Sequence, residues 1–140
     1  MNANDATLTQ LATAQTGSMV HDDAPNAPAG GGFDLIIAAA AGSALGSSGA
    51  PYTLTISAID LTAVSQPWPP QILHQAFDAA SGWTLGGTGT DYACTQTIAH
   101  TIPGGAGGPP ARHALRCVAT LVSPGAQIVA IGQSDPFVLV

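Results

Sequence analysis

The stretch DYACTQTIAHTIPGGAGGPPARHALRCVATLVSPGAQIVAIG, from Asp91 to Gly132, holds both cysteines of the chain and its clearest alternation of apolar and polar residues. Alternation with a period of two is typical of a half-buried β-strand. It predicts strands over residues 92–102, 112–122 and 127–132, separated by the turn signals PGGAGGPP and SPGA. We therefore expect consecutive antiparallel strands that form a three-stranded meander, unless the long glycine-rich loop crosses between two sheets.

The position of the two cysteines follows from this hairpin. A turn centred between Gly105 and Ala106 places Cys94 directly opposite Cys117. Opposed Cα atoms in a non-hydrogen-bonded pair lie about 4.5 Å apart, which a disulfide accepts. Two cysteines without a C-x-x-C spacing fit neither a structural zinc site nor a redox motif. We expect a structural disulfide, which favours an oxidising compartment; the alternatives are two buried free thiols or a metal or catalytic role.

The second turn is better specified. SPGA places Pro124 and Gly125 at the centre of a type II turn, where a fixed negative φ and then a positive φ are required. This turn pairs Leu121 with Ile128. Another irregularity is predicted in YTLTISAIDLTA, where the apolar phase changes at Ala58 and indicates a bulge or a strand that passes between sheets.

Short apolar stretches broken by Gly, Pro and Ser continue through the rest of the chain from Phe33 onward. This spacing is typical of an all-β sandwich or barrel. Further strands are predicted over residues 33–41, 52–63, 71–77 and 82–87, and after residue 132 into FVLV.

Residues 1–32 differ in character from the remainder of the chain. They are polar and end in DDAPNAPAGGG, a cluster of linker type. We expect an N-terminal arm or linker, with a short helix over residues 5–14 capped by Asn4. The beginning of the chain has neither a basic n-region nor an apolar h-region, so no signal peptide is expected there.

From Phe33 to the ending SDPFVLV, strand number and turn spacing resemble the bacterial immunoglobulin-like and fibronectin type III-like β-sandwiches. The resemblance implies an all-β, immunoglobulin-like antiparallel sandwich of about seven strands over residues 33–140, with 1–32 as an N-terminal extension. It concerns the fold class and implies no particular activity.

The composition excludes several kinds of function. Charged residues make up 7% of the chain, all eight acidic residues are Asp, and both basic residues are Arg. Without lysine there is neither a P-loop nor a Schiff base. A net charge of −6 argues against a nucleic-acid partner. The longest apolar run, FDLIIAAAAGSAL, is too short for a membrane span, so no membrane insertion is expected.

No catalytic pattern stands out either. G-x-S-x-G is missing, and the aspartates lie near predicted turns without forming a recognisable pair. We expect a protein that is not an enzyme and needs no metal or other cofactor. The best ligand-binding candidates are Trp68 in QPWPPQ and Trp83 in SGWTLGG, because an indole exposed at a turn can stack on a glycan; the alternative is a position in the core for at least one of them.

The shortage of charge suggests the function. A free small domain usually keeps about a quarter or more of its surface charged. Uncharged Ala/Thr-rich strands therefore favour a surface that neighbouring subunits cover. We expect a structural subunit of a self-assembling extracellular filament, surface layer or virion, in which the N-terminal arm contacts other copies. The alternative is a bacterial carbohydrate-binding or adhesion module.

Overall fold

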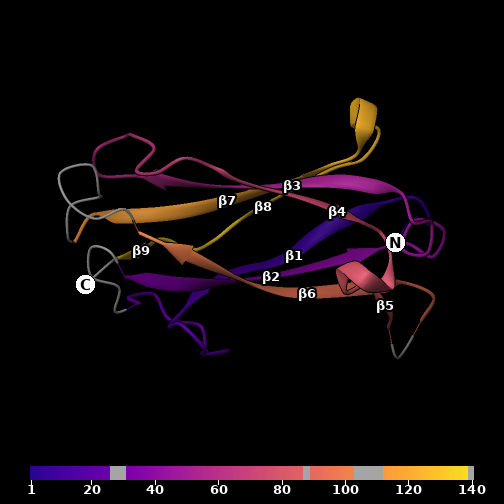
Figure 1. Ribbon diagram of the computed structural model, residues 1–140, viewed down its shortest axis with the longest axis horizontal. Helices are drawn as coiled ribbons and strands as arrows, with labels where there is room; N and C mark the ends of the chain where they lie inside the picture. Colours follow the sequence, from indigo (N-terminus) through magenta and orange to yellow (C-terminus); the bar gives the residue numbers. More distant parts are fainter. Residues whose placement is uncertain (26–30, 87–88, 103–111, 139–140) are drawn as a thin grey trace.

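Two antiparallel β-sheets pack face to face in the computed structural model of the chain (Figure 1). The structure describes residues 1–25, 31–86, 89–102 and 112–138. Within these ranges, sheet A has four strands in the order β1-β2-β6-β5. Sheet B has five, in the order β4-β3-β7-β8, with β9 also paired to β7. The predicted all-β antiparallel sandwich is confirmed.

The strands predicted after residue 33 are all found, with ends that differ by a few residues. Sheet A is made of β1 (Ala6–Ala14), β2 (Gly32–Ala41), β5 (Thr84–Leu85) and β6 (Tyr92–Thr101). Sheet B is made of β3 (Pro51–Asp60), β4 (Gln71–Ala76), β7 (Ala114–Val122), β8 (Val129–Gln133) and β9 (Phe137–Val138). Two short 3-10 helices, η1 (Ala79–Ser81) and η3 (Pro124–Ala126), lie in turns.

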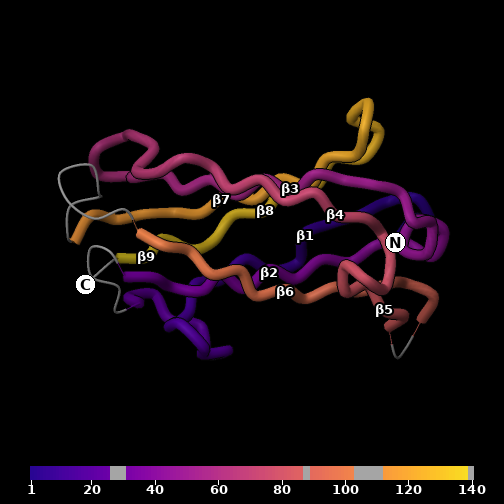
Figure 2. Tube along the Cα trace, viewed as in Figure 1, coloured from indigo at the N-terminus to yellow at the C-terminus, as the bar shows by residue number. Residues whose placement is uncertain are grey.

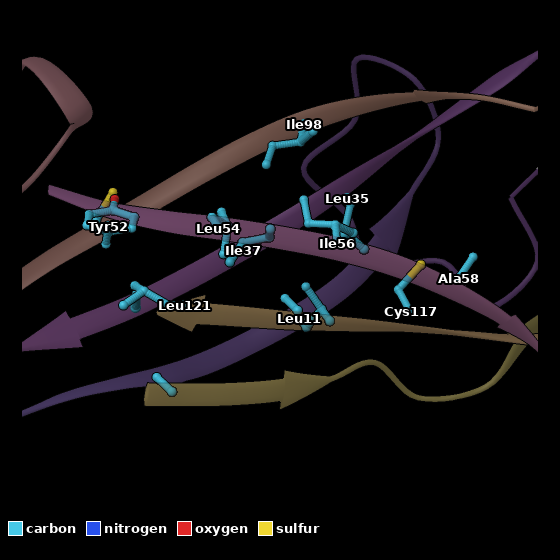
Figure 3. Close-up of a cluster of buried hydrophobic side chains, with 14 of the residues drawn as sticks. Leu11, Leu35, Ile37, Tyr52, Leu54, Ile56, Ala58, Ile98, Cys117 and Leu121 are labelled. Carbon is cyan, nitrogen blue, oxygen red and sulfur yellow. The ribbon is translucent and has the colours of Figure 1, made fainter. Parts of the chain in front are cut away.

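The alternation of β3 shows how the core forms. Every second side chain from Tyr52 to Asp60 is buried, whereas those between them face outward. The predicted change of phase at Ala58 is therefore wrong, because Asp60 continues the buried series with its carboxylate fully hydrogen-bonded. Figure 3 shows the apolar layer between the sheets, which includes Leu11, Leu35, Ile37, Leu54, Ile56, Ile98 and Leu121.

The N-terminal segment forms a strand where a short helix was predicted. β1 pairs with β2 along its length, and a register shift between Leu8 and Gln10 marks a bulge in it. Leu11 enters the core, and Leu8 lies against β8, where Gly132 leaves room because a Cβ there would be 3.0 Å from that of Leu8. Pairing with β2 supplies the backbone hydrogen bonds that an isolated helix of this length holds poorly. Residues 6–14 thus belong to the sandwich; the boundary at residue 32 stays a prediction.

The meander predicted from residues 91–132 is also wrong. β6 pairs with β2 in sheet A, and β7 pairs with β3 in sheet B, so the chain crosses between the sheets. The turn predicted at PGGAGGPP falls in 103–111, outside the described residues. A glycine-rich connection specifies no register by itself, and both strands find better apolar partners in the long strands β2 and β3.

The same crossing overturns the predicted disulfide. Cys94 and Cys117 are both buried free thiols, opposite Ala39 and Ala58 respectively. Cys94 is connected through side-chain hydrogen bonds to the Tyr52 end of β3. Tyr52 and Ala58 are six residues apart on one strand, a separation of about 20 Å at the usual rise per residue. A disulfide needs Cα atoms within about 7 Å.

The hairpin between β7 and β8 is found with a shifted register. Leu121 pairs with Ala130 instead of Ile128. The turn is longer than a two-residue type II turn, because Pro124 begins a 3-10 turn in which both Gly125 and Ala126 have positive φ, 73° and 52°. A shift of two residues leaves every side chain on its predicted face.

Candidate interaction surface

The outer face of sheet B is an uncovered layer of mostly uncharged side chains. Alternation sends every second residue of β3, β4, β7 and β8 outward, and the registers align them in rows across the sheet. One row runs Ile72, Thr55, Thr120 and Ile131. The whole face, which we call the B face, consists of Thr53, Thr55, Ser57, Ile59, Ile72, His74, Arg116, Val118, Thr120, Val122, Val129, Ile131 and Gln133.

Apolar side chains are exposed along both edges of the B face. Ile72 on β4 is 56% exposed, and Val129 and Ile131 on β8 are 52% and 67% exposed. The central strands contribute β-branched threonines and valines, which suit a pleated surface. Exposed apolar groups gathered on one face are typical of a site of association.

Acidic charge lies elsewhere on the molecule. All eight aspartates are in turns, at strand ends or on sheet A: Asp5, Asp22, Asp23, Asp34, Asp60, Asp78, Asp91 and Asp135. Only Arg116 and His74 of the B face are titratable. A protein with a net charge of −6 thus presents one broad surface without a carboxylate.

A buried aspartate at one end of sheet B has a structural role. Asp60 ends β3, and its Oδ1 accepts hydrogen bonds from the N–H groups of Thr62 and Ala63, each at 2.9 Å. Its Oδ2 is 2.8 Å from His113 Nδ1. Burial opposes ionisation, but the hydrogen bonds from Ala63, His113 and Thr62 outweigh it and lower the pKa of Asp60. Among the described residues no hydroxyl or thiol is hydrogen-bonded to His113, so the pair activates no nucleophile there.

Trp68 and Trp83 do not present stacking faces. They are 8% and 2% exposed, so the prediction of exposed indoles is wrong. Trp68 packs edge-on against Phe33, at 6.2 Å between ring centroids. Trp83 packs on Phe77 and donates its indole N–H to Tyr52 Oη at 3.1 Å. In a chain with few aromatic residues, these rings fill the core.

A buried polar network connects the two sheets beside Trp83. Tyr52 Oη donates to Gln75 Oε1 at 2.8 Å, and the amides of Gln75 and Gln96 exchange hydrogen bonds at 2.7 and 2.9 Å. Gln96 also donates to Cys94 Sγ. Burial raises the pKa values of Tyr52 and Cys94, so both side chains stay protonated. This network fixes the sheets relative to each other.

Two further buried groups have no catalytic environment. Burial raises the pKa of Cys117 to about 12, which keeps its thiol protonated and unreactive. His100 stacks on Phe33 at 5.3 Å, and no described residue is hydrogen-bonded to its Nε2. Burial lowers the pKa of His100, against the opposing influence of Asp34, so the ring is held neutral.

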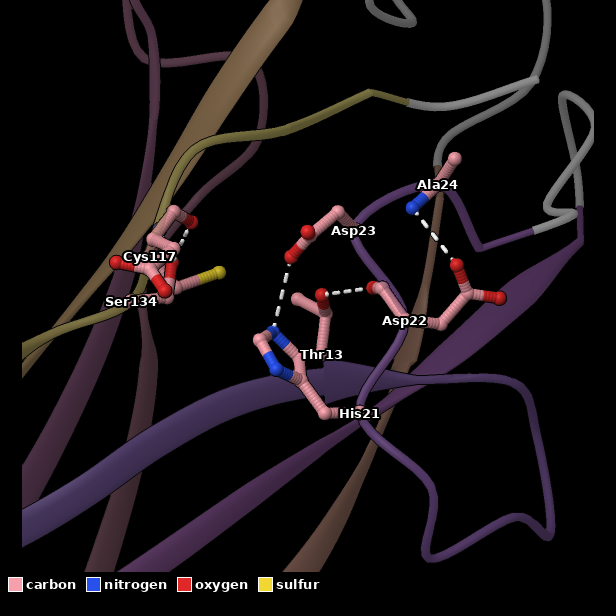
Figure 4. A network of polar contacts seen from close by, with 8 residues as sticks. Thr13, His21, Asp22, Asp23, Ala24, Cys117 and Ser134 are labelled. Carbon is pink, nitrogen blue, oxygen red and sulfur yellow. Dashed lines mark hydrogen bonds and ion pairs between the residues drawn. The ribbon is translucent and has the colours of Figure 1, made fainter.

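Residues 21–23, the sequence HDD, form a local polar cluster (Figure 4). His21 Nε2 lies 3.0 Å from Asp23 Oδ1. Hydrogen bonds from the Ala24 N–H and the Gln15 amide lower the pKa of Asp22. Over the described ranges, no group of three or more His, Cys, Asp or Glu side chains is arranged to hold a metal ion. Nor does that part of the chain contain a helix long and apolar enough to span a membrane.

No protein-family model matches the chain, and a search of the curated proteins finds no relative. The function must therefore be argued from this surface and its chemistry. The sequence contained one signal for the B face, the run of Thr and Ser at alternate positions of β3. It carried no sign that β4 and β8 would flank that run with exposed isoleucines, because this depends on which strands pair.

Proposed function

We propose that this protein is a non-enzymatic structural subunit that assembles with copies of itself. The observation that supports the proposal is the B face, a broad β-surface with exposed isoleucine and valine and no carboxylate. Copies with a net charge of −6 repel each other, and they approach at least electrostatic cost through a surface that lacks acidic groups. Apart from Arg116 and His74, the side chains of the B face carry no titratable group, so an interface there desolvates few charges.

The remaining elements of this proposal are a relation to immunoglobulin-like sandwiches and a place in an extracellular filament, surface layer or virion. No cystine supports an oxidising compartment, since both thiols are free. An N-terminal arm that contacts neighbours is now best sought in residues 15–25, because residues 6–14 are held in their own sheet. The carbohydrate-binding alternative loses its basis with the burial of both tryptophans.

The test is the molar mass of the protein in solution. We expect the mass measured by light scattering to rise with concentration, and to rise further with salt, which screens repulsion between copies. Ile131→Asp, which places a charge in the B face, should weaken assembly and lower the mass reached at a given concentration. Leu85→Asp is the matched control, because Leu85 is 59% exposed and lies on sheet A, outside the B face. A wild-type protein that stays monomeric at millimolar concentration would refute self-assembly.

A further inference from the structure

Sheet B has a gap at one edge. β3 runs to Asp60, but β4 accompanies it only as far as the pair Ile56 and Gln71. In the same register, the residues before Gln71 would bring Pro69 opposite Ala58. Proline has no N–H and cannot complete a ladder hydrogen bond. Over residues 57–59, this edge of β3 therefore has no neighbouring strand in the described part of the chain.

The peptide groups of Ala58 point into this gap. On β7, the carbonyl of Cys117 accepts from the Ser134 N–H at 2.9 Å and so faces away from β3. The opposite residue of a non-hydrogen-bonded antiparallel pair, Ala58, faces away from β7 in the same manner. Asp60, two residues on, exchanges hydrogen bonds with Ser65 on that side, at 2.8 and 3.3 Å. No described group is hydrogen-bonded to the N–H or C=O of Ala58.

A pocket lies over this free backbone edge. It has a volume of about 410 Å³ and is lined by Ser57, Ala58, Ile59, Val64, Ser65 and Gln66, none of them charged. Val64 stands at the rim with 87% of its surface exposed. Its φ of 52° is a left-handed conformation that β-branched residues rarely adopt. The pocket thus combines a free donor and acceptor with apolar walls, which is what an added uncharged peptide segment requires.

The opposite end of sheet B carries a projecting segment of fitting chemistry. The turn between β7 and β8 extends beyond the body of the sandwich, at the far end from the loop that follows β3 (Figure 2). Its residues 124–127 are all exposed and uncharged. We call them the tip. Pro124 and Ala126 provide apolar contacts, and the turn's internal hydrogen bonds occupy the Ala126 N–H but leave the N–H group of Gly125 free.

Other turns suit the gap less well. Those at residues 22–23, 78, 91 and 135 carry an aspartate, which would approach the carboxylate of Asp60. The turn after β2 is uncharged, but its N–H groups are already hydrogen-bonded, for example those of Ala44 and Leu45 to Ala3 and that of Gly49 to Phe77.

We propose that the tip of one copy docks in the gap of the next copy and hydrogen-bonds to the backbone of Ala58. This proposal rests on self-assembly, the proposed function, and specifies its contact. The two surfaces differ and lie at opposite ends of sheet B, so the contact is heterologous, and the proposal takes the rotation between copies to be one that closes no ring. Such a contact produces a linear filament, to which the B face then adds lateral association.

The test uses one blocked surface at a time. Val64→Asp blocks the gap and Ala126→Asp blocks the tip; both side chains are exposed, and Asp tolerates the left-handed φ that both positions have. Each variant alone should lose filaments, whereas Leu85→Asp, at an exposed position on sheet A, should keep them. When both variants also carry Ile131→Asp, which weakens lateral association through the B face, an equal mixture retains one free tip and one free gap. The measured mass should then double to that of a dimer and rise no further.

Each result decides a different point. A monomeric wild type would refute both self-assembly and the docking. A wild type that assembles equally well with either substitution would refute the docking alone and leave the B face as the contact. Variants that fail to assemble singly and also fail to dimerise when mixed would refute the heterologous arrangement. Hydrogen exchange adds a direct readout, since the Ala58 amide should exchange at least tenfold more slowly in filaments than in the Val64→Asp monomer.

Discussion

The outer faces of the two sheets differ in how far other parts of the chain cover them. On sheet A, residues 15–25 fold back over the strands. The Gly17 N–H donates a hydrogen bond to the Asp34 carboxylate at 2.8 Å, and Met19 Sδ accepts one from the Thr97 hydroxyl. Beneath them Ile36 is 5% exposed although it points outward. On sheet B nothing in the described chain covers the equivalent side chains. The chain shields the face that contains a strand carboxylate and leaves open the face that has none.

This difference indicates which face is available to partners. Covering sheet A satisfies Asp34 internally and removes an apolar surface from water. The B face gains no such cover even though its isoleucines are exposed. If a second copy covers the B face instead, substitutions on the two faces should affect different properties. Those on the outer face of sheet A should change folding stability, and those on the B face should change assembly.

The largest effect concerns the interior that both faces enclose. Protein denatured without reductant should show two free thiols, because neither sheet is cross-linked to the other. In the native state, a pKa near 12 for Cys117 instead of 9.0 reduces its thiolate population about 1000-fold. Reaction with a thiol reagent before and after denaturation measures this. Denatured protein without free thiols would mean that the sheets are cross-linked and the strand arrangement is different.

The next effect separates the faces directly. Ile36→Asp should destabilise the fold by about 3 kcal/mol or more, because the carboxylate would be buried without a partner. Ile131→Asp on the B face should change the free energy of unfolding by no more than about 0.5 kcal/mol. Urea denaturation of dilute protein gives both values. Equal costs at the two positions would show that sheet A is not covered as described.

A smaller effect tests the loop beside the gap. The folded pKa of Asp60 lies below 3.8. Its stabilising contribution is therefore fully present above pH 3.8 and is lost as the pH falls through the folded value. Asp60→Asn should unfold with less dependence on pH in this acidic range, measured by denaturation at several pH values. Asp5→Asn, a change at an exposed aspartate, serves as the control; an equal flattening there would remove the special role of Asp60.

The smallest effect concerns Val64 itself. Replacing it by Asn should stabilise the fold by about 1 kcal/mol, because Asn tolerates positive φ and Val does not. The same change at Val20, which has no positive φ, should bring no gain. Urea denaturation of the two variants compares them. A loss of stability in Val64→Asn would mean that the valine contributes packing within the monomer.

The sequence predicted the strands better than their partners. Alternation located β2, β3, β6 and β7, because period-two patterning depends on the strand alone. It did not place β6 and β7 in different sheets, since the choice between neighbours is made by long-range packing. The predicted Cys94–Cys117 disulfide was wrong for the same reason, because it depended on β6 and β7 being paired. β1 was missed because ATLTQLATA has no clean alternation, a consequence of its bulge.

The candidate surface was predictable only in outline. The low charge of the chain predicted a broad uncharged surface, and the alternating threonines of β3 marked one part of it. The gap in sheet B could not be predicted from the sequence, because it depends on where β4 ends relative to β3. The scarcity of aromatic residues favoured a core position for at least one of Trp68 and Trp83, but their Pro- and Gly-rich surroundings, which also suit an exposed turn, did not show that both are buried.

The pairing of β3 with both β4 and β7 also has consequences for the order of folding during synthesis. β3 and β4 are neighbours in the chain and can form a hairpin early, but β7 begins only at Ala114. Sheet A also cannot form until later, since β2 pairs with β6, which follows it by more than fifty residues. Such long-range pairing makes folding slow, on the order of milliseconds to seconds. Until β7 emerges, the apolar side of the early hairpin has no partner, and the nascent chain is at that stage most exposed to misassociation.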